Sequence, residues 1–269
     1  MPRSFTPAAG ALAKLELLRV SHAGAVTHVR LHRPAKRNAL SDPLIQQLHT
    51  CFVNLPEATH AVVLSGEGEH FCAGLDLSEL IERDVAAGVL HSRMWHAAFD
   101  QIQFGRVPVV AVLHGAVVGG GLELAASCHL RVAEASTYYG LPEGQRGIFV
   151  GGGGAVRLPR LMGVARMTDL MMTGRVYDAQ EGLQAGLSQY VVPVGQGLAK
   201  GIELAERIAG NAPMSNYAVM HALPRIADQS QAEGLLTESL MAAVAESNPE
   251  AKKRLRAFLD KRAGKVVKS

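Results

Sequence analysis

The sequence has little cysteine, few aromatic residues and no large surplus of either charge. Its three cysteines, Cys51, Cys72 and Cys128, are dispersed among 269 residues. An odd number of cysteines without a CxxC pair argues against a disulfide framework, so we expect reduced thiols in a cytoplasmic protein. The net charge of +3 is too small to predict a nucleic-acid-binding surface. Basic residues concentrate near the C-terminus, where a solvated helix face is the ordinary explanation.

The absence of several motifs excludes further classes of protein. No apolar run is long enough to cross a bilayer, so we expect no membrane contact. The eleven histidines never take HExxH spacing, which argues against a zinc site. No GxSxG, GK[ST] or GxGxxG motif supports a serine hydrolase, a P-loop or a dinucleotide-binding fold. His70 and Cys72 lie close in sequence, but we identify no third residue that would orient a cysteine nucleophile.

The composition is that of a globular chain, with 48% hydrophobic and 19% charged residues. The first half alternates strand and helix signals, with strands predicted at 25–31, 61–65, 109–113 and 129–133. The continuous apolar runs at 61–65 and 109–113 indicate a sheet that is covered on both faces. Ser41 or Asp42 is predicted to cap a helix that has Pro43 in its first turn.

From about residue 198 the pattern changes to helix only. We predict helices at 198–209, 214–227, 231–246 and 249–262, separated by Gly210, Pro213 and Asn248-Pro249. The chain therefore reads as an α/β core followed by a helical C-terminal section.

Three glycine-rich segments stand out, at residues 70–77 (HFCAGLDL), 114–124 (HGAVVGGGLEL) and 141–154 (LPEGQRGIFVGGGG). Gly119 to Gly121 follow a strand-like stretch and precede a helix-like one. Glycines let a ligand approach the backbone, and the start of a helix offers free N–H groups and a positive dipole end. Such a site can hold a phosphate or a developing oxyanion, although tight packing of helix on strand explains a glycine run about equally well.

Two carboxylates adjoin these segments. Glu123 lies among leucines and alanines, and a carboxylate is rarely buried there without a partner or a purpose. Glu143 follows Pro142 in a loop-like stretch. Two carboxylates that converge on one pocket can activate a water as base and supply a proton as acid. The alternative is a surface Glu143 and a hydrogen-bonded, structural Glu123.

Six pieces in this order resemble the enoyl-CoA hydratase/isomerase, or crotonase, superfamily, over about residues 14–262. They are RPAKRNAL (33–40), HFCAGLDL (70–77), GAVVGGGLELA (115–125), LPEGQRGIFVGGGG (141–154), MTGRVYDAQEGLQAGL (172–187) and AFLDKR (257–262). The resemblance implies an α/β fold, a crotonase-like spiral of ββα units over 14–197, followed by a helical C-terminal trimerisation region over 198–269. Within the superfamily the chain looks most like the methylthioacryloyl-CoA hydratases, which act in bacterial breakdown of dimethylsulfoniopropionate.

The resemblance implies addition of water across the 2,3 double bond of an enoyl-CoA thioester. The backbone N–H groups of Leu75 and Gly120 would form an oxyanion hole around the thioester oxygen. Glu123 and Glu143 would hold the water, and the sequence does not assign the acid and the base between them. Trp95 and Phe99, together with residues 148–150, are candidates to shape the acyl pocket, and packing is the alternative role for each of them.

The resemblance also implies a coenzyme A site, with the coenzyme as part of the substrate and no separate cofactor or metal. Its residues would be Lys36, Arg37, Ala39, Ala73, Leu75, Asp76, Leu77, Phe258 and Lys261. The last two match a terminal helix that reaches the coenzyme A of a neighbouring subunit, so the implied partner is the chain itself, as a homotrimer or a dimer of trimers. Ordinary surface charge is the alternative for the two basic residues at 36–37, and a core anchor for Phe258.

Other functions on the same scaffold stay open. An acyl-CoA hydrolase would direct water at the thioester carbon, and the methylthioacryloyl-CoA group is thought to combine hydration with this hydrolysis. An enoyl-CoA isomerase usually needs one carboxylate and a dehalogenase needs a nucleophilic aspartate, so the presence of both glutamates favours hydration. An RNA-binding relative would require a lysine-rich helix in the core, which the sequence does not show.

Overall fold

The computed structural model describes residues 4–79 and 82–260. The chain forms two compact units, with the boundary in the sequence between Ala209 and Gly210. The strands of the first unit are β1 (Thr6–Pro7), β2 (Leu18–Ala23), β3 (Val26–Leu31), β4 (Ala61–Gly66), β5 (Val109–Leu113), β6 (Ala116–Val118), β7 (Leu130–Glu134), β8 (Tyr138–Gly140), β9 (Val176–Asp178) and β10 (Tyr190–Val192). Its α-helices are α1 (Asp42–Val53), α2 (Val85–Gln103), α3 (Gly120–Ser127), α4 (Gly154–Met162), α5 (Val164–Thr173), α6 (Ala179–Ala185) and α7 (Gly197–Ala209).

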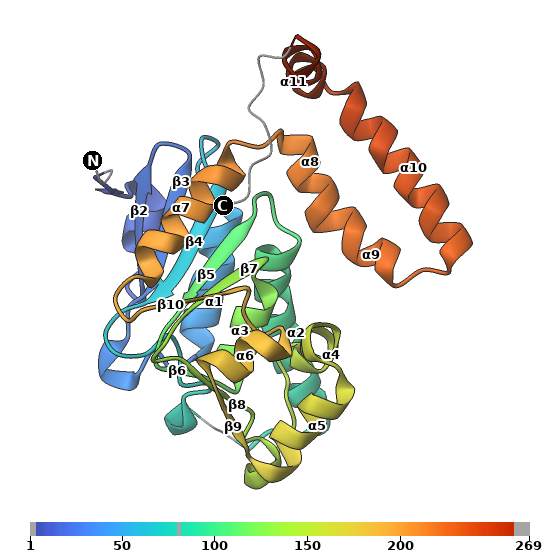
Figure 1. Ribbon diagram of the computed structural model, residues 1–269. Coiled ribbons are helices and arrows are strands. Elements are labelled where there is room, and N and C mark those ends of the chain that lie inside the picture. Colours follow the sequence, from blue (N-terminus) through green and yellow to red (C-terminus); the bar gives the residue numbers. More distant parts are fainter. Residues whose placement is uncertain (1–3, 80–81, 261–269) are drawn as a thin grey trace. The chain divides into compact units, whose positions relative to one another are not determined.

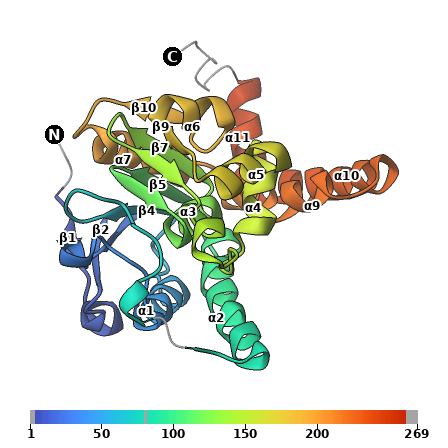
Figure 2. The ribbon, with the colours of Figure 1, turned by 90° about the horizontal axis from the view of Figure 1, so that it is seen from below.

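The first unit is built on a seven-stranded sheet in the order β1-β2-β3-β4-β5-β7-β10. Within this sheet the neighbours among β3, β4, β5, β7 and β10 pair in parallel, whereas β2 pairs antiparallel with both β1 and β3. A smaller sheet joins β6, β8 and β9. In Figures 1 and 2 the large sheet lies between α7 on one face and α1 and α3 on the other. The predicted α/β class is confirmed, and the strands expected at 25–31, 61–65, 109–113 and 129–133 correspond to β3, β4, β5 and β7.

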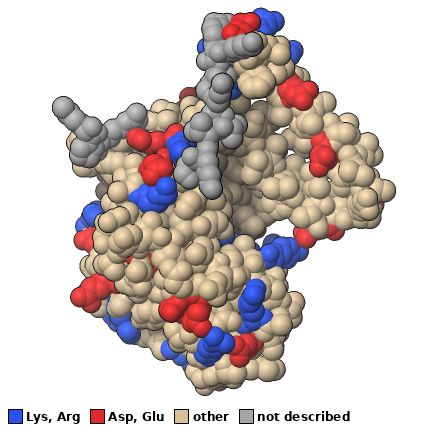
Figure 3. All heavy atoms as spheres, viewed as in Figure 1, with Lys and Arg blue, Asp and Glu red and all other residues tan. Residues whose placement is uncertain are grey.

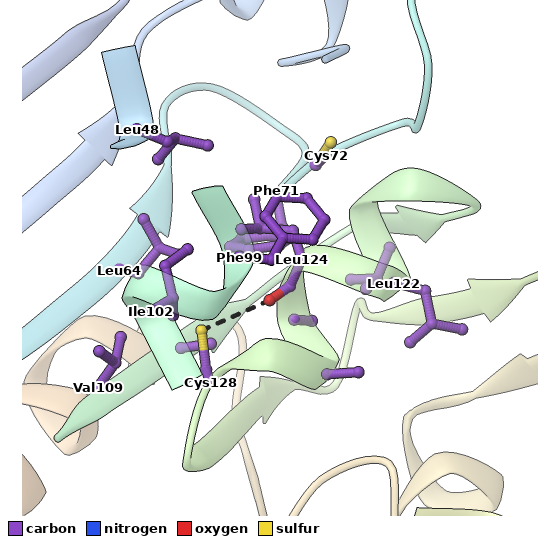
Figure 4. Close-up of a cluster of buried hydrophobic side chains, with 14 of the residues drawn as sticks. Leu48, Leu64, Phe71, Cys72, Phe99, Ile102, Val109, Leu122, Leu124 and Cys128 are labelled. Carbon is purple, nitrogen blue, oxygen red and sulfur yellow. Dashed lines mark hydrogen bonds between the residues drawn. The ribbon is translucent and has the colours of Figure 1, made fainter. Parts of the chain in front are cut away.

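The core explains why β4 is apolar at successive positions. Val62 and Leu64 belong to a large cluster with α1, α2 and α3, whereas Ala61 and Val63 belong to a second cluster with Leu204 of α7. Alternate residues of a strand point to opposite faces, so both faces of the sheet are buried. Figure 4 shows the larger cluster, in which Leu122 and Leu124 fix α3 and the Cys128 thiol donates to the Leu124 carbonyl, 3.6 Å away. This packing holds Glu123, which lies between the two leucines.

The start of α1 follows the predicted capping pattern. Ser41 is the N-cap, its hydroxyl accepts a hydrogen bond from the Leu44 N–H, and Pro43 lies in the first turn. A side-chain acceptor at this position satisfies one of the donors that the first turn of a helix leaves free.

The second unit contains α8 (Pro213–Tyr217), a π-helical turn at Ala218–Ala222, α9 (Leu223–Ala227), α10 (Gln231–Ser247) and α11 (Pro249–Leu259). The boundary that we placed between 197 and 198 needs correction. The helix α7 packs on β4 and β5 through Leu204 and Ala205, so the first unit continues to Ala209. An amphipathic pattern predicts a helix, but it does not say which surface the helix covers.

Two further observations bear on possible partners. Within residues 4–79 and 82–260, no helix has the length and apolar composition that crossing a membrane requires. On the face shown in Figure 3, lysine and arginine are interspersed with aspartate and glutamate.

Candidate active site

Two of the glycine-rich segments run side by side. The Cys72 N–H donates to the Ala116 carbonyl at 3.0 Å, and the Val118 N–H donates to the Cys72 carbonyl at 3.2 Å. Cys72 is thereby paired with Val117 of β6 in a parallel bridge. Leu75 lies three residues after Cys72, and Gly120 lies three residues after Val117. The parallel register therefore brings Leu75 and Gly120 together.

Among the described residues, the N–H groups of Leu75 and Gly120 have no hydrogen-bond acceptor. Gly120 is the first residue of α3, where an N–H has no acceptor within the helix. A second parallel bridge pairs Leu40 with Leu75. In it the Leu40 N–H donates to the Gly74 carbonyl, and the Asp76 N–H donates to the Leu40 carbonyl. The Leu75 N–H is not part of it.

The close approach of the two segments requires glycine at position 74. Gly74 has a φ of +96°, which side chains disfavour. A Cβ there would also lie 2.8 Å from the Val118 carbonyl oxygen, in the backbone that leads to Gly120. Glycine therefore lets Leu75 and Gly120 lie close enough to line one cavity.

A cavity of about 320 Å³, here called the carboxylate cavity, joins these groups to both predicted carboxylates. Leu75, Gly120, Glu123 and Glu143 all line it. Its remaining wall comes from α2 and the chain before it, and from the third glycine-rich segment: Arg83, Gly88, His91, Ser92, Trp95, Ile148, Phe149, Val150, Gly151 and Gly152. Phe99 is instead buried behind Trp95, with the ring centroids 5.9 Å apart.

Glu123 is a buried carboxylate whose Oε1 is held firmly. This oxygen accepts hydrogen bonds from the Gly152 N–H at 2.9 Å and the Gly154 N–H at 2.7 Å. Burial raises the pKa of Glu123, and the two N–H donors and the nearby Arg157 cation oppose that rise. The donors stabilise the charged form and so offset part of the effect of burial.

Glu143 lies in a different environment. It is only 7% exposed, and its Oε2 has no hydrogen-bond partner among the residues that the structure describes. Burial raises the pKa of Glu143, and the charge of Glu123 raises it further, while Arg146 opposes the rise. An unpartnered buried carboxyl beside a second carboxylate favours the protonated form. The two glutamates therefore differ in their hydrogen bonding, because Glu123 accepts from two backbone N–H groups and Glu143 Oε2 has no partner among the described residues.

A second cavity of about 300 Å³, here called the basic cavity, adjoins Leu75, which lines both. Six residues predicted to bind coenzyme A line it: Lys36, Arg37, Ala39, Ala73, Asp76 and Leu77. Arg146 adds a cation from the segment that carries Glu143. The Asp76 carboxylate is already engaged, because it accepts from Arg33 at 2.9 Å and from the Ser78 hydroxyl at 2.6 Å. Lys36 Nζ lies 3.9 Å from Asp76 Oδ1, so this single carboxylate faces several cations of the cavity. An excess of lysine and arginine suits a phosphorylated ligand.

The turn that presents Lys36 and Arg37 depends on Asn38, a residue to which no sequence motif pointed. Asn38 is fully buried and has a φ of +53°, after an Arg37 that also has a positive φ. Its amide donates to the Glu67 and His70 carbonyls, at 2.8 and 2.7 Å, and its oxygen accepts from the Arg33 N–H at 2.9 Å. Asparagine tolerates the left-handed region better than most residues, and here its side chain also bonds three backbone groups.

We expect Asn38→Ala to destabilise the protein by about 3 kcal/mol, because three buried backbone groups lose their partner. Denaturant unfolding would measure this. Asn54→Ala is the matched control, since the Asn54 amide donates to the Thr50 carbonyl at an exposed helix end and its loss should cost under about 1 kcal/mol. Equal effects of the two substitutions would contradict the role given to Asn38.

The two C-terminal residues of the predicted site belong to the second unit or lie outside the described residues. Phe258 lies on α11 in the second unit and is 65% exposed, so it does not anchor a core there. Lys261 lies outside the described residues. Their contact with a neighbouring subunit's coenzyme A stays a prediction.

The cysteine considered as a nucleophile is inert. Cys72 is completely buried, and burial raises the pKa of its thiol to about 12. A thiol with so high a pKa stays protonated at neutral pH and is a poor nucleophile. His70 does not activate it, because the His70 Nδ1 accepts a hydrogen bond from the Ala116 N–H at 3.1 Å.

Comparison with known proteins agrees with this geometry. A family model described as Enoyl-CoA hydratase/isomerase matches residues 21–266. The chain is 30% identical to an enoyl-CoA hydratase of Mycobacterium tuberculosis, covering 91% of this chain and 94% of that protein. It is 33% identical to the 2,3-dehydroadipyl-CoA hydratase of Escherichia coli, covering 90% and 95%.

The fold has similar solved structures. A crystal structure of a protein from Rhodopseudomonas palustris is 57% identical with a TM-score of 0.90, covering 94% of this chain and 98% of that one. An enoyl-CoA hydratase from Bacillus anthracis is 33% identical with a TM-score of 0.86, covering 93% and 98%.

Proposed function

The chain belongs to the enoyl-CoA hydratase/isomerase family, and from this premise we propose that it adds water across the 2,3 double bond of an enoyl-CoA thioester. One observation carries the proposal. Two buried glutamates with opposite hydrogen-bonding environments line one cavity together with two N–H groups that are free to bind an oxyanion. An isomerase usually needs one carboxylate, whereas hydration uses a base and an acid.

The two cavities support a position for each part of the substrate. The coenzyme moiety lies in the basic cavity, where Lys36, Arg37 and Arg146 meet its phosphates. The thioester lies beside Leu75, the residue common to both cavities, and its oxygen accepts from the Leu75 and Gly120 N–H groups. The enoyl group extends into the carboxylate cavity. The positive end of the α3 dipole adds to the stabilisation of negative charge at Gly120.

The hydrogen bonding of the two glutamates supports a division of the two proton transfers. Glu123, held by two N–H donors, accepts a proton from the water as the water oxygen bonds to Cβ. The electron pair of the double bond moves onto the thioester oxygen as an enolate. Glu143, whose pKa is raised by burial, then donates its proton to Cα as the thioester carbonyl re-forms. Proton exchange between the glutamates and solvent restores the starting state.

For the acyl group we propose methylthioacryloyl-CoA or an enoyl group of similar size. Trp95, Ile148, Phe149 and Val150 give the carboxylate cavity an apolar wall, which suits a short hydrophobic acyl chain. A water bound between two glutamates also lies near the thioester carbon, which keeps hydrolysis of the product as a second step on the same residues.

A panel of acyl-CoA substrates would test the reaction directly. We expect loss of enoyl absorbance with crotonyl-CoA and methylthioacryloyl-CoA, because both offer a conjugated double bond to the oxyanion hole. Free thiol measured in the same samples reports thioester hydrolysis. Migration of the double bond without hydration would identify an isomerase, and release of coenzyme A from saturated acyl-CoA without enoyl turnover would identify a hydrolase. Either result would reject the proposed hydration.

We also propose that the chain assembles as a trimer or a dimer of trimers through its second unit. The faces of α10 and α11 expose large apolar side chains that a monomer would leave in water: Leu235, Leu236, Leu240, Val244, Leu255, Phe258 and Leu259. Exposed apolar patches of this kind mark protein interfaces.

Sedimentation at micromolar concentration should give the mass of three or six chains. Leu236→Glu with Leu240→Glu should shift the protein toward monomer, because both changes place charge on the apolar faces. Glu238→Gln on the same helix is the control and should leave the mass unchanged. A wild-type protein that sediments only as monomer would count against the assembly.

A further inference from the structure

Arg157 is a buried arginine that the proposed chemistry does not use. It lies on α4, and its guanidinium makes three hydrogen bonds in different directions. Its Nε donates to Gln103 Oε1 at 2.6 Å, one Nη to Asp100 Oδ1 at 2.8 Å and the other Nη to the Gly152 carbonyl at 3.0 Å. Gln103 and Asp100 belong to α2. The rigid, planar guanidinium thus joins α2 to the glycine segment before α4.

The same glycine segment holds Glu123. Gly152 accepts from Arg157 through its carbonyl and donates to Glu123 Oε1 through its N–H, and Gly154 donates to the same oxygen. Gly153 between them has a φ of +98°. This backbone therefore accepts a hydrogen bond from the arginine on one side and donates two hydrogen bonds to the carboxylate on the other.

Glycine is required at these positions because no space is left for side chains. A Cβ on Gly153 would collide with the Arg157 guanidinium, and one on Gly154 would lie 2.8 Å from Glu123 Oε1. A Cβ on Gly152 would lie 3.1 Å from Glu123 Oε2 and from the Phe99 ring of α2. The glycine run of the third segment is thus a thin layer of backbone between an arginine and a carboxylate.

We propose that Arg157 is a positioning residue for Glu123, acting through the backbone of Gly152 to Gly154 and anchored on α2 by Asp100 and Gln103. The inference rests on the proposed hydration, in which Glu123 is the base. The helix α2 also supplies His91, Ser92 and Trp95 to the carboxylate cavity. Arg157 consequently fixes the base relative to the wall against which the acyl group lies.

Charge gives this arrangement a measurable signature. The ionisable groups that surround Glu123 are Glu143 across the cavity, Arg157 on α4 with its partner Asp100 on α2, the Cys128 thiol beside Arg157, and His91 and Arg83 in the cavity wall. The Arg157 cation favours ionised Glu123, so its removal raises the Glu123 pKa. Removal of the Asp100 carboxylate leaves that cation less compensated and lowers the Glu123 pKa.

A general disturbance of the fold would not produce shifts of opposite sign, and the charge-conserving Arg157→Lys separates positioning from charge. The test compares Arg157→Met, Arg157→Lys and Asp100→Asn with Arg160→Met, a control on the exposed side of the same helix, where Arg160 donates to the Val156 carbonyl. Two readouts are needed: titration of the Glu123 carboxyl by ¹³C NMR in the substrate-free enzyme, and kcat and KM for crotonyl-CoA. Glu123→Gln assigns the NMR signal.

We expect Arg157→Met to move the Glu123 titration upward by about one pH unit, and Asp100→Asn to move it downward by a few tenths of a unit at low salt. Arg157→Lys keeps the charge but cannot hold three acceptors in a fixed fork. It should therefore leave the titration near that of the wild type and lower kcat about tenfold, with KM within about twofold. Arg160→Met should change neither readout.

The inference is overturned if Arg157→Lys retains wild-type kcat, or if Asp100→Asn and Arg157→Met shift the titration in the same direction. If Arg157→Met does not fold, the kcat of Arg157→Lys and the titration of Asp100→Asn still test the inference. A wild-type protein that hydrates no enoyl-CoA would reject the proposed function, while the titrations alone would still test whether Arg157 and Asp100 act on Glu123.

Discussion

Replacing Glu143 with glutamine should lower hydration of crotonyl-CoA at least about 100-fold, the usual scale for loss of a general acid or base. Glutamine has the same shape, but its amide cannot give a proton to Cα. Glu123→Gln should be similarly severe, because an amide cannot take the proton from water. Steady-state kinetics on the purified variants would measure both, and near wild-type turnover in either would reject the mechanism.

The Glu143 substitution should also make the protein more stable at neutral pH. Its pKa is raised in the folded state, so the folded protein binds more protons than the unfolded one. Stability is then lost as pH rises from the ordinary glutamate pKa to the raised one, and it stays lower above that range. A neutral glutamine removes this penalty. Thermal unfolding at pH 7 should therefore show a Tm at or above that of the wild type, although activity has fallen.

Glu134→Gln is the matched control for these substitutions. Glu134 is also a buried carboxylate, but it accepts from the Gly195 and Gly197 N–H groups at 2.9 and 3.0 Å, in the turn that precedes α7. Glutamine there weakens charge-assisted hydrogen bonds outside both cavities. Its expected result is the reverse of that for Glu143→Gln, with a lower Tm and turnover close to that of the wild type. A similar loss of turnover in this variant would mean that the effect at Glu143 reflects a disturbed fold.

Replacing Gly120 with proline should lower turnover about 100- to 1,000-fold, because it removes one donor of the oxyanion hole. The first position of a helix tolerates proline, since its N–H has no acceptor within the helix, so α3 can persist. Turnover of crotonyl-CoA would be measured alongside circular dichroism. Retained activity would reject the assignment of the Gly120 N–H to the thioester oxygen.

The matched control is Gly120→Ala, which keeps the N–H. A Cβ at this position would lie 3.1 Å from the Trp95 ring and 3.3 Å from the Leu40 side chain, so alanine alone should cause some loss through crowding. The difference between proline and alanine isolates the donor. Equal losses in the two variants would show that crowding, and not the missing N–H, is responsible.

Much of the fold was accessible from sequence patterns. The strands β4 and β5 are continuous apolar runs because both faces of the sheet are covered, and a capped helix start at Ser41 has a clear local cause. The strand β2 and the helix α2 were not predicted. The pattern of α2 is weak because Gly88, His91 and Ser92 on it line a cavity instead of packing in the core.

Sequence motifs likewise predicted one part of the candidate site and missed another. The residues that the motifs carry, Glu123, Glu143, Leu75 and Gly120, do line one cavity. Asn38 and Arg157 were missed because a buried polar residue looks like a surface residue until its partners are known. Those partners are distant in the sequence: Asn38 bonds the carbonyls of 67 and 70, and Arg157 bonds residues on α2 more than fifty positions earlier.

The sequence by itself determined the alternation of elements, the positions of the three glycine-rich segments and the family resemblance that they carry. These features depend on local backbone requirements, which a short stretch of residues can specify. Only the tertiary structure decided how the two glutamates differ. Hydrogen bonds from Gly152 and Gly154 reach Glu123 across about thirty residues of sequence, while Glu143 Oε2 finds no partner among the described residues. The protonation of a carboxyl group depends on its surroundings in space, and those surroundings exist only once the chain has folded.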